Sequence, residues 1–225
     1  MKFLGIIMKK DIEMNRPSPL IKQHKNRIVE LIVPFLERVL PQFLTNSIHA
    51  KQSLDEDSFS EVLYHYLVQN GSTNFYFTQQ PLQDGRRKVD IGVSLYWQSP
   101  EKTEVAYVFC LEAKFLPSHD YVTGEYAAIK RFKLNQHGIK SRYDKTPLPE
   151  NGIVAYVRDQ DFEKHFDSIN NEITILSSKN GLDKFNLVWS ESEKLQPKSS
   201  SKSYISNHLR IDGSNFTLHH FWVKV

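Results

Sequence analysis

The stretch VAYVFCLEAKF, residues 105–115, places two charged side chains inside an otherwise apolar run. The alternation of its side chains between two faces predicts a β-strand. Glu112 and Lys114 are two positions apart, so both point to the same face of that strand. Because an unpaired charge buried in such a strand costs several kcal/mol, we expect this pair to meet partners on a neighbouring strand.

Two further strand-like runs, residues 75–78 and 89–96, precede this stretch, with short turn-forming segments between them. Short connections of this kind predict an antiparallel meander. Within the second run, Asp90 lies alone on the face opposite the apolar residues. Pairing of adjacent strands would bring Asp90 beside Glu112 and Lys114.

Helices are predicted where apolar residues recur every three or four positions. The pattern indicates one helix kinked at Pro34 over residues 20–40, and further helices at residues 55–69, 123–135 and 160–176. The other predicted elements are a buried strand, a short strand, a flexible loop and the turn of a C-terminal hairpin, at residues 153–157, 187–189, 196–203 and 212–213. Together they indicate an α/β fold. Its mixed central sheet would combine the antiparallel meander with one parallel strand, flanked by helices on both faces and followed by a C-terminal hairpin.

The size of the chain suits one domain with extensions. It has 225 residues, of which 40% are hydrophobic and 24% charged, and this composition excludes a disordered polyelectrolyte. We expect a flexible N-terminal segment over residues 1–19 and a single domain over residues 20–225. The core of that domain would span about residues 50–160, and residues 161–225 would form an extension.

Cysteine and charge content narrow the function classes. One cysteine, Cys110, excludes an internal disulfide framework and a zinc site built on several thiolates. No apolar run approaches the roughly 20 residues that a membrane-spanning helix needs, so we expect a cytoplasmic protein with no membrane partner. The net charge of +3 and the pI of about 8.8 permit a nucleic-acid partner without demonstrating one.

Two carboxylates and a lysine in one partly dry cleft suit a particular chemistry. Carboxylate oxygens bind a hard divalent cation, and a lysine orients or activates a water or stabilises developing negative charge. The alternative is that Asp90 pairs with Arg87 or Lys88, and that Glu112 and Lys114 form a surface pair. An isolated Glu-x-Lys would favour that alternative, but the order of the elements around the motif favours the catalytic interpretation.

With this order of helix, meander, basic helix and buried strand, the chain resembles the PD-(D/E)XK nuclease superfamily, which has the restriction-endonuclease-like fold. The matching residues are Asp90 in the segment KVDI and Glu112-Ala113-Lys114 in the segment FCLEAK. Val89 stands where the name of the superfamily has a proline. The resemblance covers roughly residues 50–160.

The resemblance implies metal-dependent hydrolysis of phosphodiester bonds, with DNA as the expected substrate. It implies that Mg²⁺, or Mn²⁺ in its place, is bound by Asp90, Glu112 and the carbonyl oxygen of Ala113. Lys114 would position the attacking water. A homodimer or a partner protein, and a role in phage defence or mobile-element biology, would fit a small nuclease of this kind.

Two alternative functions stay open. The same fold could bind nucleic acid without cutting it or serve as a scaffold subunit, although the complete trio of Asp90, Glu112 and Lys114 argues against a degenerate site. A different enzyme could use a glutamate and a lysine in one cleft without any nucleic acid. Salt-sensitive binding to DNA would separate that enzyme from the other two possibilities.

Members of the superfamily often carry a further glutamate on the helix before the meander, and the chain offers Glu56 and Glu61. At about 100° per residue, Glu61 falls nearly opposite the apolar stripe of residues 59–66. Glu56 falls at the edge of that stripe, where its side chain can reach past the core toward the sheet. We therefore expect Glu56 to complete the acidic cluster as a direct or water-mediated ligand. Its alternative role is to stabilise the helix N-terminus together with two neighbouring aspartates.

Basic residues after the motif are candidates for phosphate contacts. Residues 130–145 include six lysines or arginines and one acid, and directly follow the strand that carries the motif. In the C-terminal hairpin, alternation places two more basic residues on one face with Ser206. The predicted nucleic-acid contacts are Lys130, Arg131, Lys133, Lys140, Arg142, His208 and Arg210. A solvated helix face and the polar face of an ordinary hairpin are the alternatives. Of the adjacent His219 and His220, at most one is expected to be functional, because strand neighbours point in opposite directions.

Overall fold

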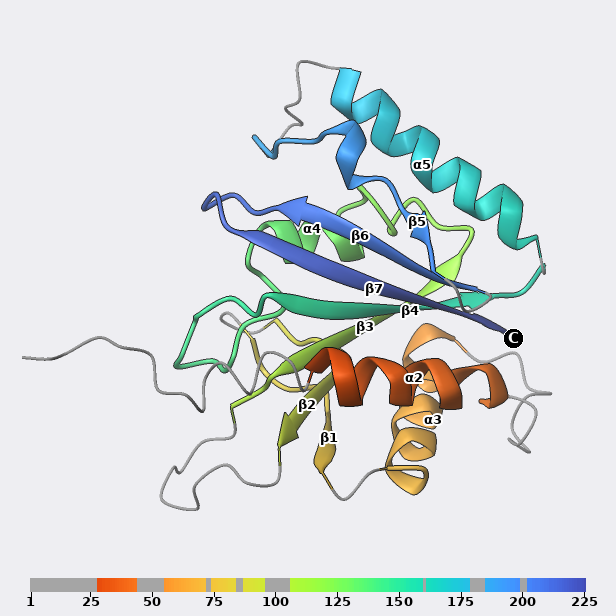
Figure 1. Ribbon diagram of the computed structural model, residues 1–225, viewed down its shortest axis with the longest axis vertical. Helices are drawn as coiled ribbons and strands as arrows, with labels where there is room; N and C mark the ends of the chain where they lie inside the picture. The colour runs from red at the N-terminus through yellow and green to blue at the C-terminus, as the bar shows by residue number, and fades with distance from the viewer. Residues whose placement is uncertain are drawn as a thin grey trace, which may run out of the picture.

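The computed structural model of the chain describes residues 28–43, 55–71, 74–83, 87–95, 106–159, 161–178, 185–198 and 202–225. Its centre is a seven-stranded mixed sheet with the strand order β1-β2-β3-β4-β7-β6-β5 (Figure 1). The strands are β1 (Phe75–Gln79), β2 (Ile91–Leu95), β3 (Phe109–Leu116), β4 (Glu150–Val157), β5 (Gln196–Pro197), β6 (Ser203–Leu209) and β7 (Asn215–Lys224). The segment predicted to be flexible, residues 1–19, lies outside the described residues.

The sheet has a parallel centre between two antiparallel ends. β1, β2 and β3 pair antiparallel, which confirms the predicted meander, and β4 pairs parallel with β3 as expected. β7 also pairs parallel with β4, a contact that the sequence did not predict. It joins the C-terminal hairpin to the meander in one continuous sheet. The turn of that hairpin lies where it was predicted, with Gly213 at a φ of +82° that favours glycine.

Helices cover both faces of the sheet, as predicted (Figure 1). One face carries η1 (Ile28–Ile32), α2 (Val33–Val39), η2 (Leu40–Gln42) and α3 (Glu56–Gln69), and the other carries α4 (Ala128–Lys133), α5 (Phe162–Ser178) and η3 (Glu191–Glu193). Each face encloses its own apolar core. None of the helices that the structure describes is long and apolar enough to span a membrane.

Two helices differ from their predicted form. The helix expected at residues 20–40 is described from Ile28 on, where a π-helical turn leads into α2. Pro34 is the second residue of α2, so the proline, which has no N–H to donate, lies at a helix start instead of kinking a helix middle. The helix expected at residues 123–135 is reduced to α4, because the preceding residues form turns closed by backbone hydrogen bonds such as Gly124 N to His119 O (2.9 Å).

The part of the chain between α5 and the hairpin also differs from expectation. Residues 187–189 form no strand of the sheet. In the low-complexity stretch predicted as a loop, Gln196 and Pro197 form β5 at the edge of the sheet, and Ser203 begins β6. Proline is tolerated at such an edge because no further strand needs the N–H group that proline lacks.

Candidate active site

The start of α3 is tied to the middle of the sheet. Asp55 caps the helix by accepting a hydrogen bond from the Ser58 amide (2.8 Å), so that Glu56 is the first helical residue. The Glu56 carboxylate then reaches β3, where it lies 2.5 Å from Lys114 Nζ and accepts a hydrogen bond from the Phe115 amide (3.2 Å). The predicted direction of Glu56 is confirmed, whereas Glu61 points to solvent.

The edge of β3 opens where β2 ends. The pairing of β2 with β3 runs from Val93–Phe109 to Ile91–Leu111 and then stops. Beyond it, two β3 amides need acceptors: the Ala113 amide donates to Asp90 Oδ2 (2.7 Å) and the Phe115 amide donates to Glu56 Oε2. Two carboxylates therefore line the open edge of β3. Asp90 occupies a bend just before β2, although the sequence placed it inside the strand.

Glu112 and Lys114 share one face of β3, as their spacing predicted. Both are nearly buried, at 2% and 7% exposure, and Lys114 Nζ lies 3.6 Å from Glu112 Oε1. Lys114 is therefore placed between Glu112 and Glu56. Burial alone would lower the pKa of Lys114, but the negative charges of these two glutamates outweigh it and raise the pKa. The ammonium group thus stays charged at neutral pH.

The pKa values of Asp90 and Glu112 are shifted in opposite directions. Burial, together with the negative charge of Glu112, raises the pKa of Asp90 well above its ordinary value. Burial would also raise the pKa of Glu112, but its interactions with His137, Lys114 and Arg131 outweigh this effect and lower that pKa to about 2. Neighbouring acids with opposite shifts are a common feature of sites that handle protons or metal ions.

Two further side chains contact Glu112: Arg131 from α4 and His137 from the segment that follows α4. Arg131 Nη1 donates to Glu112 Oε1 (2.8 Å), so this residue, predicted as a phosphate contact, lies against the carboxylate itself. His137 Nδ1 lies 3.0 Å from Glu112 Oε2. Neither of those two atoms, nor His137 Nε2, has a partner with hydrogen-bond geometry among the residues that the structure describes. Sequence reasoning missed His137, because no local pattern around it marks its approach to β3.

Four of the predicted phosphate contacts are buried in the protein. Lys130, Lys133, His208 and Arg210 are at most 3% exposed. Lys133 Nζ bonds both carboxylate oxygens of Glu193 (2.6 Å each), and Arg210 donates to the backbone carbonyls of Phe132 and Leu148. These contacts correct the prediction: the positive charges are used inside the fold and are not available to a nucleic acid.

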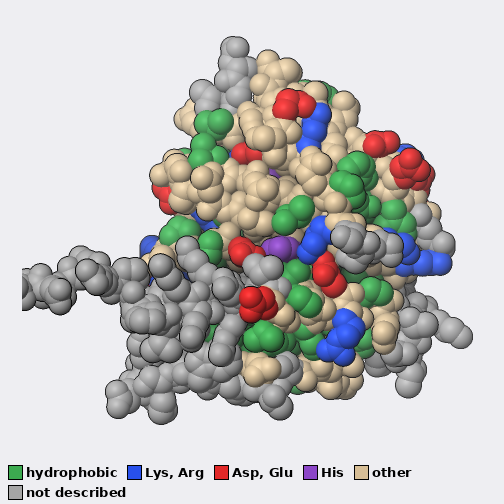
Figure 2. All heavy atoms as spheres, viewed as in Figure 1, with side chains coloured by type: hydrophobic (Ala, Val, Ile, Leu, Met, Phe, Trp, Pro, Cys, Tyr) green, Lys and Arg blue, Asp and Glu red, His purple; other side chains and the backbone are tan. Residues whose placement is uncertain are grey.

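The other two predicted contacts remain accessible. Lys140 is half exposed, 3.6 Å from Asp144, and Arg142 lies on the surface with its guanidinium carbon 4.5 Å from the centre of the Tyr143 ring. On the face that Figure 2 shows, basic and acidic side chains are interspersed and form no extended basic patch.

The predicted metal ligands fit a divalent cation. The part of the chain that the structure describes has no group of three or more His, Cys, Asp or Glu side chains that could hold a metal ion. The predicted site needs only two such side chains, Asp90 and Glu112, with a backbone oxygen. A buried Glu112 oxygen without a hydrogen-bond partner in the described part of the chain lies beside the Asp90 carboxyl group, whose pKa is raised by burial and by the negative charge of Glu112. A hard cation bound between such oxygens would stabilise their charged forms. The Ala113 carbonyl faces the same open edge, because the amide and carbonyl of one strand residue point to the same side.

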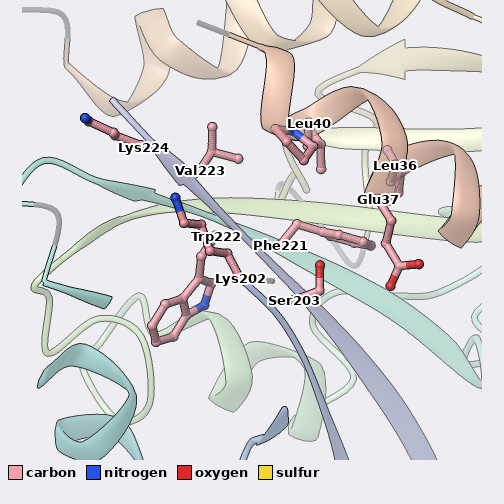
Figure 3. A pocket seen from close by; sticks show the side chains of 10 residues that line it. Leu36, Glu37, Leu40, Lys202, Ser203, Phe221, Trp222, Val223 and Lys224 are labelled. Atoms are coloured by element: carbon pink, nitrogen blue, oxygen red, sulfur yellow. The ribbon is translucent and has the colours of Figure 1, made fainter. Parts of the chain in front are cut away.

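A separate hollow lies between α2 and β7 (Figure 3). Its walls are mostly apolar, with Leu36, Phe221 and Trp222 among the lining residues. The carboxylate of Glu37 is paired with Lys198, 2.5 Å away. None of the predicted functional residues lines this hollow.

Comparisons of the chain with models of known protein families, with curated proteins and with solved structures found no match. The interpretation of the site therefore depends on its geometry. That geometry consists of Glu56, Asp90, Glu112 and Lys114 at the open edge of β3, with Arg131 and His137 against Glu112.

Proposed function

We propose that this chain is a metal-dependent nuclease of the PD-(D/E)XK type, with a restriction-endonuclease-like fold, that hydrolyses phosphodiester bonds in DNA. The observation that carries the proposal is the convergence of Asp90, Glu112 and Lys114 where β2 leaves β3. The order of the surrounding elements, α3-β1-β2-β3-α4-β4, is the order expected for that fold.

Asp90, Glu112 and the carbonyl of Ala113 would hold the magnesium ion, and the same oxygen ligands suit manganese. Magnesium bound there would stabilise the negative charge that develops on the phosphate. The carboxylates supply the negative charge that attracts the cation, and the open edge of β3 leaves their oxygens free of a neighbouring strand.

Lys114 would orient the attacking water and stabilise negative charge in the transition state. Because its raised pKa keeps it protonated, it acts as a hydrogen-bond donor and not as a base. Glu56 holds the ammonium group from the other side, so it is a positioning residue for Lys114. Arg131, only partly exposed beside Glu112, would contact the substrate phosphate.

A binding or scaffold subunit of the same fold is the second candidate. One observation favours it: three cationic or ionisable side chains already surround Glu112. A structural ion cluster has the same appearance. Such a cluster would not respond to magnesium, whereas a metal site would raise the melting temperature of the wild type but not of Glu112→Ala.

The test is a magnesium-dependence assay. Supercoiled plasmid and labelled single-stranded DNA and RNA are incubated with wild type, Glu112→Ala and Lys114→Ala, with Mg²⁺ or Mn²⁺ and with a chelator. We expect cleavage that needs the metal and is lost in both variants, while the exposed control Glu61→Ala keeps it. Full activity in Glu112→Ala or Lys114→Ala would contradict the proposal. Salt-sensitive binding without cleavage by folded wild type would support the second candidate.

A further inference from the structure

An exposed aromatic ring lies beside Arg131, a residue of the candidate site. Tyr126 is 56% exposed and precedes α4, whose first residues are buried. The guanidinium carbon of Arg131 lies 5.3 Å from the centre of the Tyr126 ring. The same guanidinium donates to Glu112 Oε1 (2.8 Å). A single side chain therefore connects the exposed ring with a carboxylate of the candidate active site.

The turn that presents Tyr126 is held on both sides. The Ala127 amide donates to the Gly124 carbonyl (3.2 Å) and the Ala128 amide donates to the Asp120 carbonyl (2.9 Å). Lys130 Nζ also donates to the Gly124 carbonyl. Single exposed aromatic side chains are common on protein surfaces. This one differs because its backbone is fixed and its ring lies against an arginine that Glu112 holds in place.

Part of the positive charge of the segment after β3 is buried inside the fold. Of the six lysines and arginines in residues 130–145, Lys130 and Lys133 are buried. A protein that tracks duplex DNA commonly neutralises about 6–10 phosphates. Stacking of an unpaired base on an aromatic ring contributes about 1–3 kcal/mol for each base and needs no further charge. The exposed ring therefore suits a strand whose bases are free to stack.

We infer that Tyr126 is a stacking platform for an unpaired nucleobase, next to the phosphate that Arg131 would contact. The inference depends on the proposed nuclease function and narrows its substrate class to single-stranded nucleic acid, including the unpaired part of a frayed or gapped duplex. Bases inside a duplex are stacked on each other and cannot offer a face to Tyr126. DNA and RNA share this chemistry, so both are tested.

The experiment measures binding in the presence of a chelator, so that cleavage plays no part. Fluorescence anisotropy compares wild type, Tyr126→Ala and Tyr126→Trp on labelled single-stranded DNA, single-stranded RNA, the same strands with abasic positions, and duplex DNA. We expect Tyr126→Ala to weaken binding to single strands by about 5- to 150-fold, and Tyr126→Trp to retain it. On abasic strands, wild type and Tyr126→Ala should bind alike, because no base is left to stack.

Tyr143→Ala is the matched control. Tyr143 is 69% exposed and is also paired with an arginine, but no described interaction joins Tyr143 to Glu112. Wild-type affinity of Tyr126→Ala for single strands, or an equal loss in Tyr143→Ala, would overturn the inference. An equal loss on duplex DNA would overturn it as well. If folded wild type binds no nucleic acid at all, the proposed function fails together with the inference. If wild type binds single strands and Tyr126→Ala binds them equally well, only the inference fails.

Discussion

Two nearly buried glutamates in this protein, Glu112 and Glu193, each face a lysine and a histidine. Glu112 is 2% exposed and lies on β3, and Glu193 is 3% exposed and lies on η3. Both oxygens of Glu193 bond Lys133, and its Oε1 also accepts from the Leu209 amide (3.0 Å). Glu112 keeps one oxygen without a hydrogen-bond partner among the described residues. The two clusters thus contain the same residue types but differ in how completely they are bonded.

The cluster of Glu193 continues into a chain of hydrogen bonds through the sheet. Trp222 Nε1 can only donate, so it donates to Tyr121 Oη (3.2 Å), and the Tyr121 hydroxyl donates to His220 Nδ1 (2.7 Å). His220 Nε2 then carries a proton and donates to Ser206 Oγ (2.7 Å). Ser206 donates in turn to His208 Nε2 (2.6 Å), which leaves the proton of His208 on Nδ1, facing the glutamate. This direction gives each hydrogen bond of the chain one donor and one acceptor, although His208 Nδ1 has no hydrogen-bond partner among the described residues. Burial lowers the pKa of both histidines, which favours their neutral forms.

The comparison shows what distinguishes a candidate site from a structural cluster. Burial of a glutamate, a lysine and a histidine together occurs in both places. Both clusters contain a buried histidine nitrogen without a hydrogen-bond partner among the residues described. Of the two, the cluster at β3 has the unbonded glutamate oxygen, and it lies beside Arg131 and Glu56, whose side chains are 20% and 34% exposed. Unused hydrogen-bonding capacity near solvent is therefore the better guide to function here.

The largest expected effects come from the same substitution in each cluster. Glu112→Gln removes the charge of a proposed metal ligand on β3, so we expect cleavage to fall at least about 10²- to 10³-fold with the fold retained. Glu193→Gln removes the charge of the carboxylate that bonds the buried Lys133, so we expect the free energy of unfolding to fall by about 3–5 kcal/mol. Cleavage rates and urea unfolding measure the two effects.

The control for the stability effect is Glu191→Gln. Glu191 lies on η3 with Glu193, but its ion pair with Lys194 is exposed, so little change in stability is expected. If Glu112→Gln proves to be the variant that unfolds, or if Glu193→Gln proves neutral, the distinction between an open and a closed cluster is wrong.

A smaller effect is expected at Glu56, which holds Lys114 without itself contacting the substrate. Glu56→Gln keeps a hydrogen-bond acceptor but removes the charge beside the ammonium group. We expect kcat to fall about 10- to 100-fold while binding of nucleic acid in the presence of a chelator stays unchanged. Glu61→Gln, on the exposed face of the same helix, is the control. A weakened affinity with an unaltered kcat would assign Glu56 to binding instead.

The smallest expected effect is the contribution of the buried His220 to the pH dependence of stability. Burial, with the nearby His208 and His219, lowers the pKa of His220 well below its ordinary value of 6.5. The unfolded chain takes up a proton at this histidine as the pH falls through about 6.5, whereas the folded chain does not. Stability is therefore complete above about pH 6.5 and falls below it, by up to about 1.4 kcal/mol per pH unit for each such histidine.

Urea unfolding of wild type and His220→Gln between about pH 7.5 and pH 5 measures this slope. His220→Gln should be less stable than wild type at neutral pH. Its free energy of unfolding should also depend less steeply on pH, by up to about 1.4 kcal/mol per pH unit. Asp90, whose raised pKa acts in the opposite direction, is present in both proteins and does not affect their difference. Substitution of the exposed His65 is the control and should leave the slope unchanged. Equal slopes for wild type and His220→Gln would contradict a neutral, buried hydrogen-bond chain.

Much of the fold could be predicted from local patterns. The meander, α3, α5 and the hairpin turn follow from alternation, helical periodicity and a glycine at a positive φ. The direction of Glu56 followed from its angle around α3, and the shared face of Glu112 and Lys114 followed from their spacing. These properties depend on residues close in sequence, whose relative directions are set by the geometry of a helix or a strand.

By itself, therefore, the sequence determined most of the elements around the candidate site and the directions of their side chains, although it did not predict β5 or the short extent of α4. Only the tertiary structure decided which charges are buried, which are paired and which stay open. Lys133 was expected to contact phosphate, but its partner Glu193 lies 60 residues further along the chain. His137 gave no local signal, because its position beside Glu112 arises from the packing of the segment after α4 against β3. The physical reason is that the direction of a side chain is a local property, whereas its partner and its exposure depend on contacts between distant segments.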